Sequence, residues 1–344
     1  MSGRAKITKK LFNKKSKKKA ELPSRITNDT VAEHRERVLA GGRKLKYPVQ
    51  YTRSALVRNT IIISVVALLL LLGAVWLQLY IVKDTSDIAY RITRATRVPV
   101  AKIDNEFVPY SDYLLYYRAS MAHIKNQTQS SGDMPWDKLN FQREQAMEKA
   151  LRDAYARKLA RENNITVSDK KIDDLIEKAR KASGLSEKAY AAATKDNLNW
   201  TMDEMKLALK NDLLRQEVSF SVDKEAQKTA KEISDLATGG SSLADIAQKM
   251  GNRVSYVQDV VVPAGNADGG LSEEVGKLQV GETSAPIKTT ATDGYYIALR
   301  QQADSEHISY SYIKVPLTVF DSNFKKLRQS DKTRLYIKLD KQGE

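Results

Sequence analysis

The sequence predicts a single-pass membrane protein whose larger part is a bundle of helices followed by a small α+β domain. An uncharged apolar run extends from Thr60 to Val82. Residues 111–213 then repeat apolar side chains at helical spacing, and residues 308–313 alternate them at the spacing of a strand. These patterns divide the chain into a basic N-terminal tail, a membrane helix and a larger C-terminal part.

The apolar run of 23 residues is long enough to be a transmembrane helix. At about 1.5 Å per residue it reaches roughly 34 Å, against a hydrocarbon core of about 30 Å. A cleaved signal peptide has a shorter apolar stretch after a short basic region, with small residues at a cleavage site. Here a long tail, residues 1–58, precedes the run, and Lys83-Asp84-Thr85-Ser86 follows it. We therefore expect an uncleaved anchor over residues 59–82.

The positive charge lies almost entirely before the membrane helix. Residues 1–58 carry 17 Lys and Arg against 4 Asp and Glu, so their net charge is +13 of the chain's +15. By the positive-inside rule this end stays in the cytoplasm and residues 83–344 lie outside. We expect the tail to be largely disordered and to attract anionic lipids. No nucleic-acid partner is expected, because no aromatic residues are interleaved with its lysine block at residues 14–19.

The composition excludes several kinds of site. The chain has no cysteine, which excludes disulfides, a cysteine nucleophile and thiolate zinc sites. Of the three histidines, His34 precedes the membrane helix, and only His123 and His307 follow it. A metal site of three histidines cannot form from the C-terminal part, and we expect no metal, no other cofactor and no small-molecule substrate.

After a polar linker at residues 83–97, the sequence predicts a short hairpin and then about five helices. Val100 and Ile103 lead into the turn Asp104-Asn105, and Phe107-Val108 follows. The predicted helix starts are the N-cap Ser111, residue 137, the N-caps Ser168 and Ser186, and Thr201 in a capping-box pattern with Glu204. The second of these helices is predicted over residues 137–163.

The order of these elements resembles a known family. The hairpin VAKIDNEFV, the Ser-Asp-Tyr after it and the helix ending ARKLARENNITVSDKKIDDLIEKA are similar to the N-terminal chaperone domain of SurA- and PrsA-type foldases. The continuation from Gly184 to Gln216 keeps the family's order of a glycine, a helix, a turn and a helix. The resemblance covers residues 98–217 and implies a helical chaperone domain that binds unfolded or newly secreted polypeptides outside the cytoplasm.

Residues 218–315 resemble a parvulin-type (PpiC-like) peptidyl-prolyl isomerase domain, which accompanies the helical domain in those families. Both of the family's histidines are replaced: one position falls at Ser219, expected on the first strand, and the other at Tyr296. Only nine residues separate Leu271 from Gly281, where the family has a longer segment that lines the proline pocket. The matching elements are the helix Lys224–Leu236, the segment Gly239–Ala247, the turn Gly269-Gly270-Leu271, the segment Val280–Ile287 and the strand Asp293–Ile297.

These departures favour binding over catalysis. Isomerisation requires an apolar slot that holds the proline ring and polar groups that favour the twisted amide over the planar one. The resemblance therefore implies a degenerate domain whose enzymatic activity is open. If the domain is active, the candidates to replace the family's polar groups are Ser219, Asp259, Asp268 and Tyr296.

The tyrosines near the end of the chain suggest a contact surface. Their alternation with polar residues is typical of a half-buried sheet face, and amphipathic rings also suit a groove for polypeptide clients. The candidate client-binding residues are Tyr295, Tyr296, Tyr310 and Tyr312. In the C-terminal extension, residues 316–344, the segment Lys332–Leu339 suggests an edge strand or the start of a further degenerate parvulin unit.

The hypothesis from the sequence is thus a membrane-anchored, extracytoplasmic foldase. It would combine an all-α chaperone bundle with a small α+β parvulin-like domain. Two alternatives remain open: an active peptidyl-prolyl isomerase with an unusual site, and a non-catalytic cell-envelope protein with one dedicated partner.

Overall fold

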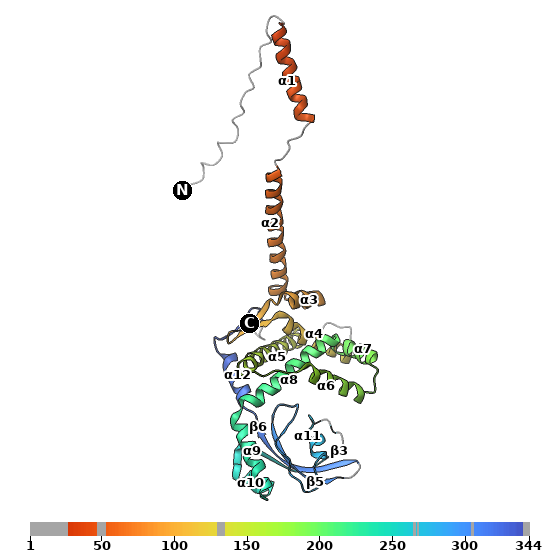
Figure 1. Cartoon of the computed structure of the whole chain (residues 1–344), viewed down its shortest axis with the longest axis vertical. Helices are drawn as coiled ribbons and strands as arrows, with labels where there is room; N and C mark the ends of the chain where they lie inside the picture. The colour runs from red at the N-terminus through yellow and green to blue at the C-terminus, as the bar shows by residue number, and fades with distance from the viewer. Residues whose placement is uncertain are drawn as a thin grey trace. The chain divides into compact units, whose positions relative to one another are not determined.

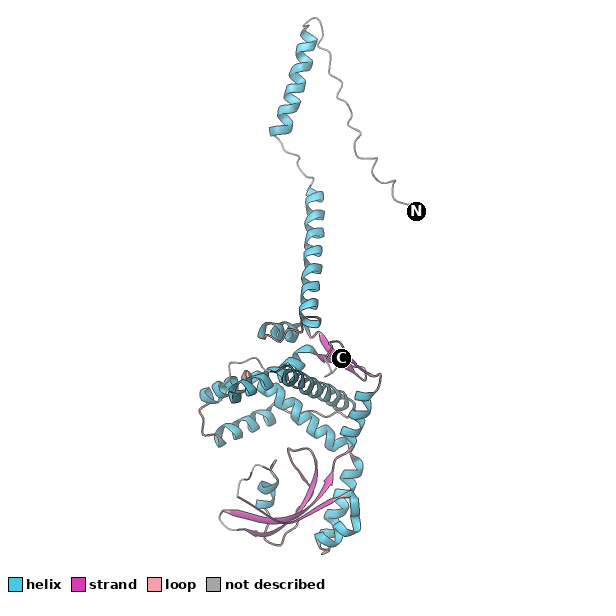
Figure 2. Ribbon diagram, turned by 180° about the vertical axis from the view of Figure 1, so that it is seen from behind, coloured by secondary structure: helices cyan, strands magenta, loops and turns pink. Residues whose placement is uncertain are grey.

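The structure, a computed structural model, describes residues 27–46, 53–128, 135–263, 266, 268–303 and 306–339. The chain divides into two units, Met1–Ala74 and Val75–Glu344. It is mostly helical, with a small sheet region toward the C-terminus (Figures 1 and 2).

The first unit contains α1 (Asn28–Lys46) and most of α2 (Arg53–Tyr80). In α2, the stretch Ser54–Tyr80 is long and apolar enough to cross a membrane. This stretch contains most of the predicted apolar run, which ends two residues later at Val82.

The described part of the predicted tail contains the helix α1. This helix forms there because Asp29 favours its positive N-terminal end, and because Glu33 pairs with Arg37 one turn later at 3.1 Å. The lysine block at residues 14–19 lies outside the described residues.

Residues 83–97, which we predicted as a polar linker, contain the helix α3 (Asp87–Thr96). The Ser86 hydroxyl caps this helix by accepting the Ala89 N–H at 3.2 Å, and Arg97 ends it in a left-handed conformation. The sequence-based prediction missed α3 because its few apolar residues are separated by arginines.

The predicted hairpin is present as β1 (Pro99–Ile103) and β2 (Glu106–Pro109). A third strand from the other end of the chain, β7 (Thr333–Leu335), pairs antiparallel with β1 and gives the order β2-β1-β7. The predicted C-terminal edge strand is therefore confirmed. It completes the N-terminal hairpin, so it does not start a further parvulin unit.

Between β2 and residue 222 the described residues form five helices, in agreement with the prediction. Ser168 and Ser186 cap two of them, and Thr201 and Glu204 form the predicted capping box. One cap is a correction: the first helix already begins at Tyr110, so Ser111 lies in its first turn. The bounds are α4 (Tyr110–Thr128), α5 (Trp136–Glu162), α6 (Asp169–Ala182), α7 (Glu187–Leu198) and α8 (Met202–Val222).

The main apolar core joins α4 and α5 to the hairpin and to the C-terminal segment. Leu114 and Leu151 are fully buried in it, as is Ile103 of the hairpin. A helix beyond the sheet region, α12 (Val319–Gln329), adds Phe320, whose ring lies 5.2 Å from that of Tyr155. The C-terminal helix α12 therefore packs against α5 in the core of the helical bundle.

The sheet region is a four-stranded antiparallel sheet of order β3-β6-β5-β4 with helices on both faces (Figure 1). Helices α9 and α10 share one apolar core with one face, and α11 shares another core with the opposite face. The elements are α9 (Lys224–Thr238), α10 (Leu243–Met250), the 3-10 turn Gly251–Arg253, β3 (Ser255–Pro263), α11 (Leu271–Gly276), β4 (Ile287–Lys288), β5 (Gly294–Ala303) and β6 (His307–Pro316).

Several predicted local features of this region are present. The helix over 224–236 is α9, the turn at Gly269 and Gly270 has both residues in positive-φ conformations, and residues 294–297 begin β5. Gly294 is required where β5 starts, because a Cβ there would lie 2.6 Å from the Val315 carbonyl oxygen.

Candidate functional site

Three tyrosine rings gather on the α11 face of the sheet, and we call them the tyrosine cluster: Tyr296 from β5 and Tyr310 and Tyr312 from β6. The ring centroids of Tyr296 and Tyr312 are 5.3 Å apart, and those of Tyr310 and Tyr312 are 6.1 Å apart. Residues 310, 312 and 314 lie on one face of the sheet, because every second residue of a strand points to the same side. Tyr296 shares that face because it pairs with Lys314 across the strands.

Two carboxylates accept hydrogen bonds from this cluster. The Tyr296 hydroxyl donates to Asp293 Oδ2 at 3.0 Å, and Lys314 Nζ approaches the same oxygen at 2.5 Å. The Tyr310 hydroxyl donates to Asp268 Oδ2 at 3.3 Å. Asp268 also accepts the Ser272 backbone N–H at 3.0 Å, so it holds the first turn of α11 beneath the tyrosines.

The environment keeps these tyrosines neutral. Burial raises the pKa of Tyr296, and its hydrogen bond to Asp293 and the negative charge there raise it further. Burial likewise raises the pKa of Tyr310, and Asp268 adds to the shift. Both hydroxyls are therefore donors at neutral pH, each already directed at a carboxylate, and neither supplies a base.

The four predicted client-contact tyrosines differ in their exposure. Tyr295, Tyr296 and Tyr310 are 3%, 8% and 2% exposed, so their rings are packing groups in this structure. Tyr295 lies in the α9 core, on the opposite face to the cluster, with its ring 4.9 Å from that of Phe220. Of the four, Tyr312 is the one that remains partly exposed.

The structure brings two of the four catalytic candidates together. Tyr296 belongs to the tyrosine cluster, and Asp268 accepts a hydrogen bond from Tyr310 of the same cluster. The charge of Asp268 contributes to the raised pKa of Tyr296. Asp259 lies at a bulge of β3, where it has φ 53° and accepts from Gln301 Nε2 at 2.7 Å. Ser219 is a correction: it lies on α8 and not on a strand, and its hydroxyl donates to the Arg215 carbonyl at 2.8 Å.

A basic groove that sequence reasoning missed lies beside the two-residue edge strand β4. Lys224, Lys228 and Lys231 come from α9, and Lys288 of β4 completes the groove together with Pro286. The lysine spacing i, i+4, i+7 in α9 could have indicated a basic helix face. The local sequence does not predict that β4 packs beside this face.

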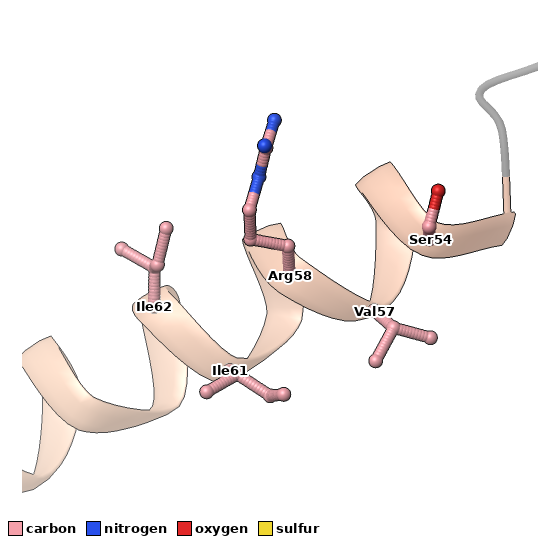
Figure 3. Close-up of a pocket in the computed structure, with 5 residues that line it drawn as sticks. All are labelled: Ser54, Val57, Arg58, Ile61 and Ile62. Carbon is pink, nitrogen blue, oxygen red and sulfur yellow. The ribbon is translucent and has the colours of Figure 1, made fainter.

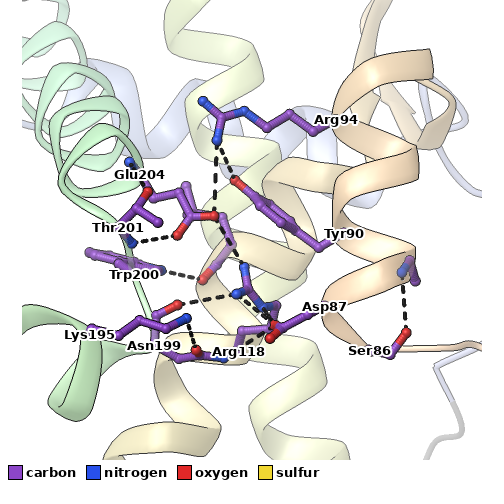
Figure 4. Close-up of polar contacts among 12 residues, drawn as sticks. Ser86, Asp87, Tyr90, Arg94, Arg118, Lys195, Asn199, Trp200, Thr201 and Glu204 are labelled. Carbon is purple, nitrogen blue, oxygen red and sulfur yellow. Dashed lines mark hydrogen bonds and ion pairs between the residues drawn. The ribbon is translucent and has the colours of Figure 1, made fainter.

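A polar network that we call the α3 clamp joins α3 to α4 and α8 through Asp87, Tyr90, Arg94, Arg118 and Glu204 (Figure 4). The Arg118 guanidinium lies 2.7 Å from Asp87 Oδ1, 3.5 Å from Glu204 Oε1 and 4.3 Å from the centre of the Tyr90 ring. Arg118 is itself buried, so its charge depends on these partners.

A shallow depression at the start of α2 is lined by residues of that helix alone (Figure 3). Ser54, Val57, Arg58, Ile61 and Ile62 follow one another along one side of the helix. Lipid would cover such a surface if α2 spans a membrane, and we assign it no ligand.

Comparison with protein families matches residues 52–219 to the SurA-like N-terminal domain. Residues 52–219 form a SurA-like domain. Comparisons with curated proteins and with solved structures find no match.

The SurA-like domain contains α2, α3, the β1-β2 hairpin and the bundle, and it ends at Ser219 within α8. The family supports a chaperone-type function in general, and SurA-like domains are of the extracytoplasmic type. The sheet region lies beyond the match, so its likeness to parvulins remains a prediction from the residues.

Proposed function

We propose that this chain is a membrane-anchored extracytoplasmic chaperone that binds unfolded or newly secreted polypeptides. The observation that carries the proposal is the SurA-like domain, whose match begins at residue 52 and therefore includes the apolar helix α2. A chaperone domain joined directly to a helix of membrane-spanning length would act on polypeptides close to the membrane surface.

The proposed orientation places α1 in the cytoplasm and residues 83–344 outside. It rests on the net charge of +13 in residues 1–58. Because the chain has no cysteine, single cysteines can report the orientation without background. In intact spheroplasts, a membrane-impermeant thiol reagent should label the exposed position of Ser241→Cys and spare that of Val38→Cys. The reverse labelling pattern would reject the orientation.

The proposed client surface surrounds Tyr312. Val257 of β3 pairs with Tyr312 across the strands and is 37% exposed, so the two side chains form a partly open apolar patch on the α11 face. In the sheet that the described residues form, β3 is also an edge strand. Its outer backbone groups can pair with an extended client while the patch accepts apolar side chains.

Site-specific crosslinking tests this surface. A thiol-linked photocrosslinker at Val257→Cys should capture a chemically denatured client when the full chain is embedded in nanodiscs. The same probe at Ser241→Cys, in the exposed turn before α10, is the matched control and should capture little. Equal capture at the two positions would mean that the patch has no special role in client binding.

A further inference from the structure

The helix α3 exposes one apolar face in the described structure. Ile88 is 70% exposed and Ile92 is 38% exposed, one turn apart, and Arg91 lies exposed beside them. The opposite side of the helix is buried through Ala89, Tyr90 and Thr93. A pair of exposed isoleucines one turn apart, flanked by arginine, is typical of a helix that lies in a membrane interface.

The α3 clamp fixes which face points outward. Arg118 binds Asp87 at the start of the helix and covers the Tyr90 ring, while Arg94 lies 4.0 Å from Glu204. Rotation of α3 to hide Ile88 and Ile92 would separate buried Arg118 and Glu204 from their partners, which is costly for buried charges. Figure 4 shows these contacts from α3 to the neighbouring helices.

The end of α2 is held on the same unit as α3. Leu79 is buried in the core that contains Ala89 and Tyr90, and its carbonyl accepts the Tyr110 hydroxyl at 2.9 Å. Ile81 and Val82, which follow α2 directly, are 61% and 55% exposed. Exposed apolar side chains thus lie both at the end of the predicted membrane helix and on α3, separated by the short polar segment 83–87.

We propose that α3 lies in the headgroup layer of the membrane that α2 spans, with Ile88 and Ile92 inserted and Arg91 directed at lipid phosphates. This inference rests on the proposed membrane anchoring. Arginine suits this position because its planar guanidinium binds phosphate oxygens in pairs. An interfacial α3, clamped to α4 and α8, sets the height and tilt of the bundle above the bilayer.

Depth-dependent quenching tests this placement in the full chain. An environment-sensitive fluorophore on Ile88→Cys is placed in nanodiscs that contain anionic lipids and lipids spin-labelled near the headgroup. The exposed site tolerates the substitution, because no packing is lost. Quenching should be several-fold stronger than for the same fluorophore on Ser241→Cys. Equal quenching at the two positions would overturn the proposal.

Two further variants separate this inference from the anchoring on which it rests. A fluorophore on Leu70→Cys should be quenched by spin labels deep in the acyl chains if α2 spans the bilayer. If Leu70 is quenched and Ile88 is not, the anchor stands and the placement of α3 is wrong; if neither is quenched, the anchoring itself fails. Arg91→Glu should reduce quenching at Ile88→Cys in anionic nanodiscs, and an unchanged signal would contradict the proposed arginine–phosphate contact.

Discussion

At the scale of single residues, the two positions that we predicted to correspond to parvulin histidines, Ser219 and Tyr296, lie in different kinds of element. Tyr296 lies on the predicted strand, but its hydroxyl is hydrogen-bonded to Asp293 and its ring is buried. Ser219 lies on α8, within a helical hydrogen bond to Arg215. The two residues therefore do not recreate a pair of polar groups around a substrate.

This arrangement predicts very little isomerase activity. The full chain in nanodiscs should barely accelerate the cis-to-trans conversion of an Ala-Pro test peptide. A loss of about 3–4 kcal/mol of transition-state stabilisation lowers a rate several-hundred-fold. Ser219→His together with Tyr296→His should not restore activity, because the first histidine would remain on a helix. Strong activity in the unmodified chain, abolished by Asp268→Ala, would show that the domain is an enzyme.

The sequence predicted that tyrosines share one face of the sheet, but it did not predict that α11 packs on that face. Alternation along β6 places Tyr310 and Tyr312 on one side of the sheet, and this follows from the two-residue period of a strand. Which side chains stay open depends on α11, whose Leu271 and Val275 pack on that face from a distant part of the sequence. For this reason the local sequence pattern could not predict that Tyr310 is buried and that Tyr312 is partly exposed.

At the scale of elements, the sequence predicted helices and turns that carry their own signals. Ser168, Ser186 and the Thr201–Glu204 box each satisfy backbone groups at a helix start, so they act locally and were read correctly. The elements that were missed depend on distant partners. The helix α3 is held by Arg118 and Glu204, and α12 is held by Tyr155 of α5.

The C-terminal segment should stabilise the hairpin at the start of the second unit, because β7 pairs with β1. Ile337 is 3% exposed in the core of the bundle, and β7 just before it pairs with β1. Ile337→Ala should lower the free energy of unfolding by about 2–5 kcal/mol, because it leaves a cavity. Hydrogen exchange should speed up at the β1 amides near Ala101 in particular.

Its matched control is Lys338→Ala, which alters the adjacent, exposed side chain. This variant should change the free energy of unfolding by less than about 0.5 kcal/mol. If Ile337→Ala increased exchange in the four-stranded sheet and left β1 unchanged, the C-terminal segment would not stabilise the hairpin.

At the scale of the whole molecule, one chain combines an apolar helix, a SurA-like domain and a sheet region. The SurA-like match covers the helix and the bundle, and it supports a chaperone-type function. The sheet region adds the partly open patch at Val257 and Tyr312, which we propose as the client surface. The central claim is that this combination binds many unfolded polypeptides and does not serve one dedicated partner.

Aggregation of chemically denatured proteins tests that claim most directly. Light scattering from several unrelated clients is followed with the full chain in nanodiscs, with empty nanodiscs as the blank. We expect suppression near one chain per client. It should be weakened by Val257→Ser and unaffected by Val280→Ser, which changes a valine that is 62% exposed, against 37% for Val257, elsewhere in the sheet region. Absence of suppression with every client would contradict the account.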